Sequence, residues 1–158
     1  MIRYALRVIL TPMATTAPVI VRSRGNFRNE VQAGPHRFVL DEPASAGGTD
    51  AGPTPYDAMA AAVGGCTSMT LHFYARREGI PLEGVDATVT HDRQYAKDCA
   101  DCMSQEGYVH RFRVELKLYG PLSEEQRLKL LDVAKRCPVV KTLQSQIKVD
   151  DVLAPATP

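Results

Sequence analysis

Two cysteines of this chain lie in segments that suit sulfur chemistry. Cys66 lies within Gly64-Gly65-Cys66-Thr67-Ser68-Met69, and Cys137 lies within Arg136-Cys137-Pro138-Val139. Each falls on the apolar, core-facing side of its own predicted helix. Two thiols on separate packed elements can act as the attacking and the resolving sulfur of one reaction. The pair therefore predicts thiol redox chemistry.

The thiolate is the reactive form of cysteine, and an apolar setting raises the pKa of a thiol. A helix that begins at Pro55 places Cys66 about 16 Å from its N-terminus, beyond the reach of the helix dipole. Cys66 therefore needs a cationic partner. The alternative interpretation is an inert core cysteine, both for Cys66 and for Cys137, which stands where a short helix from Val139 to Leu143 begins.

Cys99 and Cys102 form a separate C-x-x-C pair in a predicted loop from Ala96 to Gly107. Three interpretations stay open: two exposed, idle thiols, which we favour, a redox-active dithiol, or half of a zinc site. The zinc interpretation would need His91 and His110, each eight residues away along a strand. We therefore expect no metal and no cofactor.

The elements that carry these residues follow from apolar periodicity. A helix is predicted from Thr54, its cap, and Pro55 to the stop signals Gly79 and Pro81. Its core-facing stripe is Met59, Ala62, Val63, Cys66, Met69, Thr70 and Phe73. Because apolar residues also lie on its other sides, the helix is expected to be central and buried, in a dimer.

The second predicted helix starts at Ser123, which has capping-box spacing to Gln126. Leu130, Val133, Ala134 and Cys137 lie on one side of it, and Pro138 ends or kinks it.

Strands are predicted on both sides of the first helix. Short strands at Val19 to Val21, Arg28 to Gln32 and Arg37 to Leu40 form an antiparallel meander. Two longer ones, Val85 to His91 and His110 to Leu118, alternate apolar and polar residues and are paired so that Val85 meets Leu116 and His91 meets His110. Ile147 and Val149 suggest a final strand. The mixture predicts an α+β domain.

Length and composition limit the function classes. The chain has 158 residues, 44% of them hydrophobic, with 19 Lys and Arg against 18 Asp and Glu. One domain over residues 19–152 is expected, with an N-terminal extension over residues 1–18 and a tail over residues 153–158. The balanced charge and the lack of a basic block exclude nucleic acid as an expected partner, and neither a membrane span nor a secretory signal is evident. A cytoplasmic protein is expected.

Several segments together resemble the OsmC/Ohr family, the osmotically induced and organic hydroperoxide resistance proteins. They are Gly52-Pro53-Thr54-Pro55-Tyr56-Asp57, Ala60-Ala61-Ala62-Val63-Gly64-Gly65-Cys66-Thr67, Asp98-Cys99-Ala100-Asp101-Cys102, Leu122-Ser123-Glu124-Glu125-Gln126-Arg127 and Ala134-Lys135-Arg136-Cys137-Pro138-Val139. The resemblance runs from about Val19 to Val149.

The resemblance implies an intertwined α+β homodimer, with antiparallel sheets around two long central helices and active sites at the subunit interface. It also implies a thiol peroxidase of organic hydroperoxides, in which Cys66 attacks and Cys137 resolves. The Cys66 to Cys137 disulfide would then be reopened by an external dithiol reductant, which in this family is often a lipoylated protein.

The chain departs from the family pattern before the catalytic helix. The family's peroxidases have there an acidic residue that orients an arginine toward the thiolate, whereas this chain has Tyr56, with Asp57 one residue later. The arginine matches Arg24 best and Arg28 second. Two functions therefore stay open: the peroxidase, or a non-catalytic dimeric binding or redox-sensing protein of the same fold.

Overall fold

The computed structural model describes residues 17–99 and 106–155. Its chain divides into two compact units, with the division between Thr54 and Pro55. Most of the expected N-terminal extension, residues 1–16, lies outside the described residues, as does Cys102. The domain boundaries at residues 19 and 152 stay predictions.

The N-terminal unit contains the predicted meander. Strands β1 (Val19–Ser23), β2 (Asn29–Ala33) and β3 (His36–Leu40) form one antiparallel sheet in the order β1-β2-β3. Val21 pairs with Val31, and Val31 pairs with Phe38. The turn between β2 and β3 contains Gly34 at φ +59°, a left-handed conformation that glycine adopts without a steric penalty.

A buried carboxylate organises the loop after β3. The Asp41 side chain accepts hydrogen bonds from the backbone N–H groups of Glu42 (2.9 Å), Thr49 (3.0 Å) and Ala51 (3.2 Å), and from the Thr49 hydroxyl (2.5 Å). These bonds, the Thr49 hydroxyl first, lower the pKa of Asp41 to about 2. The short 3-10 helix η1 (Ala44–Ala46) lies within this loop.

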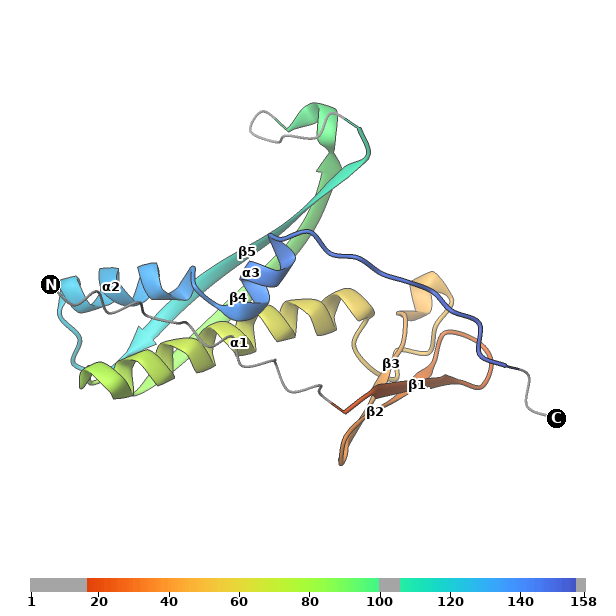
Figure 1. Ribbon diagram of the computed structural model, residues 1–158, viewed down its shortest axis with the longest axis horizontal. Coiled ribbons are helices and arrows are strands. Elements are labelled where there is room, and N and C mark those ends of the chain that lie inside the picture. The colour runs from red at the N-terminus through yellow and green to blue at the C-terminus, as the bar shows by residue number, and fades with distance from the viewer. Residues whose placement is uncertain (1–16, 100–105, 156–158) are drawn as a thin grey trace, which may run out of the picture. The chain divides into compact units, whose positions relative to one another are not determined.

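The C-terminal unit consists of a long hairpin and three helices (Figure 1). Its elements are α1 (Pro55–Glu78), β4 (Gly84–Tyr95), the 3-10 helix η2 (Ala96–Asp98), β5 (Tyr108–Tyr119), α2 (Glu124–Ala134) and α3 (Pro138–Leu143). The α+β class with antiparallel sheets and helices is confirmed. Both ends of the first predicted helix are also confirmed, because α1 begins at Pro55 and stops before Gly79, which has φ +66°.

The predicted pairing of the two long strands was wrong by two residues. Val85 pairs with Leu118 rather than Leu116, and His91 pairs with Phe112 rather than His110. Side chains alternate with a period of two, so a slip of two residues leaves the same side chains on each face. The apolar pattern therefore could not distinguish the two pairings.

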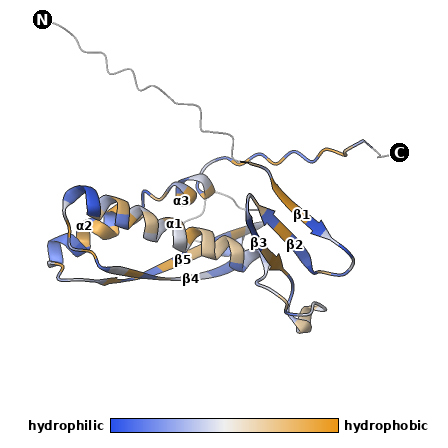
Figure 2. Cartoon of the chain, turned by 90° about the horizontal axis from the view of Figure 1, so that it is seen from below, coloured by the Kyte–Doolittle hydropathy of each residue, from blue (hydrophilic) through white to orange (hydrophobic). Residues whose placement is uncertain are grey.

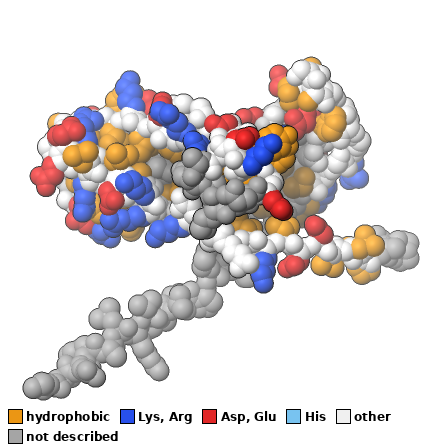
Figure 3. Space-filling model, turned by 90° about the horizontal axis from the view of Figure 1, so that it is seen from above, with side chains coloured by type: hydrophobic (Ala, Val, Ile, Leu, Met, Phe, Trp, Pro, Cys, Tyr) orange, Lys and Arg blue, Asp and Glu red, His pale blue; other side chains and the backbone are white. Residues whose placement is uncertain are grey.

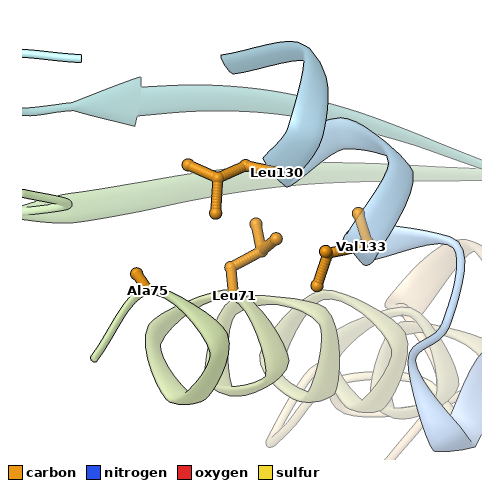
Figure 4. Close-up of a cluster of buried hydrophobic side chains, with 5 residues drawn as sticks. Leu71, Ala75, Leu130 and Val133 are labelled. Carbon is orange, nitrogen blue, oxygen red and sulfur yellow. The ribbon is translucent and has the colours of Figure 1, made fainter. Parts of the chain in front are cut away.

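The core of the C-terminal unit lies between α1 and α2. Leu71 and Ala75 of α1 meet Leu130, Val133 and Ala134 of α2 in one buried cluster (Figure 4). α2 begins with the predicted capping box, in which Ser123 Oγ accepts from Gln126 N–H and the Gln126 side chain accepts from Ser123 N–H. This packing fixes the end of α2 and hence the position of Cys137.

Two other sequence predictions were wrong for the single chain. The α1 residues that are buried are Val63, Gly64, Thr67, Leu71 and Ala75, whereas Met69 and Phe73 are 74% and 69% exposed. α1 is apolar over much of its length (Figure 2), so its periodicity did not decide which side faces the sheet. Ile147 and Val149 form no strand and are exposed, because no described strand pairs with them.

No helix within residues 17–99 and 106–155 combines the length and the apolar character that crossing a membrane requires.

Candidate functional site

Cys66 and Cys137 come together from different elements. Cys66 lies in the middle of α1, and Cys137 lies between α2 and α3, where it is the N-cap residue of α3. Both are free thiols, and their side chains are joined by a hydrogen bond. Cys137 is 0% exposed, while Cys66 is partly exposed. The two predicted site residues therefore form a contacting pair of which Cys66 is the accessible member.

The pKa of the Cys66 thiol is raised. Burial is the largest cause, and the hydrogen bond to Cys137 adds to it, because a thiol that donates is stabilised in its protonated form. The backbone N–H of Val139 and the Thr70 hydroxyl act in the opposite direction and are outweighed. Within the C-terminal unit, Cys66 is therefore the less acidic thiol of the pair.

The pKa of Cys137 is lowered. Burial opposes its thiolate, but four hydrogen bonds to the sulfur outweigh burial. They come from the Cys66 thiol, the Thr67 hydroxyl and the backbone N–H groups of Val140 and Val139. Hydrogen bonds to an ionised sulfur stabilise the charged form. Cys137 is thus the more acidic thiol, although it is the less accessible one.

Two threonines of α1 lie beside this pair. Thr67 is only 2% exposed, and its hydroxyl finds no oxygen or nitrogen partner among the described residues. The sulfur of Cys137 is the group with which it interacts. Thr70 donates its hydroxyl to the carbonyl oxygen of Cys66 at 2.8 Å. Thr67 was not predicted as a site residue, although its polar side chain next to Cys66 on an apolar helix was a signal for it.

A cleft of about 800 Å³ opens between α1, β5 and α3. Most of its lining is apolar: Pro55, Met59, Val63, Val109, Phe112, Val114, Val140 and Leu143. Tyr56, His110, Arg111 and Gln144 complete the lining. Val63 and Val140 each stand three residues from a cysteine of the pair, so one end of the cleft lies close to the two sulfurs. An apolar cleft with few polar groups is typical of a small-molecule site.

The other end of the cleft is aromatic. The ring of Tyr56 stacks on His91 at 4.5 Å and on His110 at 5.8 Å, and His91 stacks on Phe112 at 4.6 Å. His91 Nε2 and His110 Nδ1 are 2.9 Å apart and share a hydrogen bond. The two histidines are diagonal neighbours on one face of the hairpin, which the predicted pairing had placed directly opposite each other.

The remaining sequence candidates lie elsewhere. Arg24 and Arg28 belong to the N-terminal unit, between β1 and β2, and Arg28 pairs with Glu30 at 3.0 Å. The assignment of Arg24 to Cys66 stays a prediction.

Cys99 differs from the favoured interpretation of two exposed thiols, and Cys102 lies outside the described residues. Cys99 is 6% exposed and is bonded in a disulfide, and a disulfide sulfur is not the thiolate that zinc requires. Among the residues that the structure describes, no three His, Cys, Asp or Glu side chains converge as a metal site would require.

Comparison with known proteins identifies the fold. Residues 48–150 match the family model for OsmC-like proteins, which is well over half of the chain. No curated protein matches the chain.

Three similar solved structures share 20% to 22% sequence identity with this chain. An OsmC-like protein from Mycoplasma pneumoniae has a TM-score of 0.68 and 20% identity, over 84% of this chain and 89% of that one. The organic hydroperoxide resistance protein OsmC from Legionella pneumophila has a TM-score of 0.59 and 21% identity, over 81% of this chain and 90% of that one. A putative organic hydroperoxide resistance protein from Vibrio cholerae, with captopril bound in one active site, has a TM-score of 0.59 and 22% identity, over 84% of this chain and 88% of that one. At these identities the likeness shows the fold alone.

Proposed function

The chain belongs to the OsmC-like protein family, and on this premise we propose that it is a cysteine-based thiol peroxidase that reduces organic hydroperoxides. One observation carries the proposal: two free thiols from separate elements contact each other beside one end of an apolar cleft. Relatives of the same fold are described as organic hydroperoxide resistance proteins, which supports the same substrate class.

We give the first step to Cys66 because it is the more exposed of the two sulfurs. The Cys66 sulfur bonds to the distal peroxide oxygen, the O–O bond breaks, and the alkoxide leaves as an alcohol after taking up the thiol proton. Cys66 is then a sulfenic acid. The Cys137 thiolate attacks the sulfur of this acid, the S–O bond breaks, hydroxide leaves, and a disulfide forms. Two electrons have passed from the two sulfurs to the peroxide, and an external dithiol, for which a lipoylated protein is the candidate, restores the thiols.

A cationic group would speed the first step, because the pKa of Cys66 is raised within its own unit. We assign this role to Arg24, with Arg28 as the second choice. The protein would act as a homodimer.

The proposal is tested by single-serine variants. Cys66→Ser is expected to abolish consumption of cumene hydroperoxide. Cys137→Ser should still reduce one equivalent and leave a sulfenic acid that a dimedone probe traps. Dithiol reductants should support turnover better than monothiols, and cumene hydroperoxide should be preferred to hydrogen peroxide. Equal loss of the first equivalent in both variants would contradict the order of attack.

A second candidate function is a non-catalytic binding or redox-sensing protein. It is favoured by Tyr56, which takes the place of the family's acidic residue and stacks on two histidines instead of presenting a carboxylate. A wild type that binds apolar ligands but consumes no hydroperoxide with any reductant would support this alternative.

A further inference from the structure

The linked pair of His91 and His110 has a chemistry of its own. With Nε2 of His91 bonded to Nδ1 of His110, one outer nitrogen remains on each ring. When the pair is neutral, one outer nitrogen donates a hydrogen bond and the other accepts. When the pair holds one extra proton, both outer nitrogens donate and the pair carries a positive charge. It then becomes an anion-binding group.

The pair is too far from the sulfurs to take part in their reaction. Tyr56, which stacks on both histidines, lies ten residues before Cys66 on α1, or about 15 Å along the helix axis. The apolar cleft occupies this interval, because Met59 and Val63 of α1 line it between Tyr56 and Cys66. A ligand that reaches both ends must therefore be long and mostly apolar.

The charged and titratable side chains around the aromatic end are mostly basic. His110 and Arg111 line the cleft, Arg93 pairs with His110 across the hairpin, and the acidic Asp92 pairs with Arg111. No acidic side chain lines the cleft among the residues described. The nearest acidic group on α1, Asp57, lines a different and smaller cleft with Gly64 and Val89. On α1, the titratable group that stacks on the pair is Tyr56. Val140 and Leu143 of α3 and its C-cap residue Gln144 also line the main cleft, and none of them is charged.

We infer that His91 and His110, held in place by Tyr56, form a subsite for the carboxylate of an amphiphilic ligand whose apolar chain lies in the cleft toward Cys66. In the proposed function, on which this assignment of a substrate class rests, the ligand is a hydroperoxide with its peroxide about 15 Å from an anionic group. The carboxylate accepts a charge-assisted hydrogen bond from His110 Nε2. His91 shares the positive charge of the pair through its hydrogen bond to His110.

Calorimetric titration with decanoate and with its uncharged methyl ester tests the subsite. Wild-type protein is expected to bind decanoate about tenfold more tightly than methyl decanoate, because only the carboxylate accepts a charge-assisted hydrogen bond from the pair. His110→Gln, which cannot carry a charge, should lose the tenfold difference and leave binding of the ester unchanged.

His72→Gln is the matched control, because His72 lies on the same helix 16 residues beyond Tyr56, about 24 Å away along its axis. It should retain the tenfold difference. Circular dichroism confirms that both variants fold. The inference is overturned if wild-type protein binds decanoate no more tightly than its methyl ester, if His110→Gln keeps the difference, or if neither probe binds. The probes contain no peroxide, so the outcome is independent of whether the protein reduces hydroperoxides.

Discussion

Accessibility and acidity are divided between the two site cysteines. Cys66 is the more exposed of the two sulfurs, but burial and its hydrogen bond to Cys137 raise the pKa of its thiol. Cys137 is enclosed, yet hydrogen bonds favour its thiolate. The resolving step therefore starts from the more acidic thiol of the pair. It needs only the sulfenic acid on Cys66, and this order suits a pair in which only one sulfur meets the substrate.

Thr67 should control the acidity of the resolving thiol. Thr67→Val keeps the shape of the side chain and removes the hydroxyl that stabilises the Cys137 thiolate, so the pKa of Cys137 should rise. Ultraviolet titration of the Cys137 thiolate in a Cys66→Ser background measures this rise. In the Thr67→Val protein that retains Cys66, the sulfenic acid on Cys66 should persist longer at neutral pH before the disulfide forms.

Thr70→Val is the control for Thr67→Val, because the Thr70 hydroxyl bonds to the Cys66 carbonyl oxygen and not to Cys137. It should leave the Cys137 titration unchanged, and Thr67→Ser should restore it. A Cys137 titration that is identical in Thr67→Val and wild-type protein would show that the hydroxyl has no such role.

At the scale of elements, the packing of α1 on α2 fixes the geometry of the site. Leu71 lies within the buried cluster with Leu130 and Val133. Leu71→Ala should lower the free energy of unfolding by about 2–5 kcal/mol, because it removes buried methyl groups and leaves a cavity. Chemical denaturation measures the loss. Leu128→Ala, on an exposed position of α2, is the control and should change stability by about 0.5 kcal/mol or less. Equal effects of the two substitutions would contradict this core.

The loop after β3 should make stability depend on acid. The pKa of Asp41 is about 2 in the folded protein and has an ordinary value of 3.8. The folded state therefore binds the proton less readily, so the stabilisation is fully present above about pH 4 and is lost as pH falls through 2. Asp41→Asn should lower the melting temperature at neutral pH. The difference in melting temperature between this variant and wild type should become smaller as the pH approaches 2. A gap that is constant from pH 7 to pH 2 would contradict the assignment.

The elements were mostly predictable because their signals are local. Pro55 and Gly79 mark the ends of α1, and Ser123 with Gln126 marks the start of α2. The hairpin pairing was not predictable from apolar alternation, because a slip of two residues buries the same face. A strand at Ile147 and Val149 requires a pairing partner, and alternation alone does not supply one.

The candidate site was predictable only in part. The two cysteines were found from their segments, and their contact followed from the family resemblance. The stack of Tyr56 on His91 and His110 depends on the hairpin pairing and on where α1 crosses the sheet, and neither is encoded in a local pattern. Thr67 was missed because its significance lies in burial beside Cys137, which only packing decides.

At the scale of the whole molecule, single-chain packing leaves hydrophobic surface uncovered. Met69 and Phe73, one helical turn apart on α1, are 74% and 69% exposed, and Leu128 and Leu131 of α2 are exposed as well. Figure 3 shows a face on which hydrophobic side chains lie among charged ones of both signs. Burying one large apolar side chain contributes roughly 1.5–3 kcal/mol, and a two-fold interface counts each residue twice. The exposed side of α1 is therefore suited to a second copy of this chain.

We expect a dimer at micromolar concentration by light scattering, in which Met69 and Phe73 are buried. Phe73→Glu should convert it to a monomer, because the dimer would have to bury two unpaired carboxylates. Phe73→Leu is the matched control, which keeps the apolar surface and should remain dimeric. If Leu128→Glu dissociates the dimer and Phe73→Glu does not, the interface lies on α2. A wild-type monomer would contradict the dimer itself, and α1 would then expose these side chains to water in the working protein.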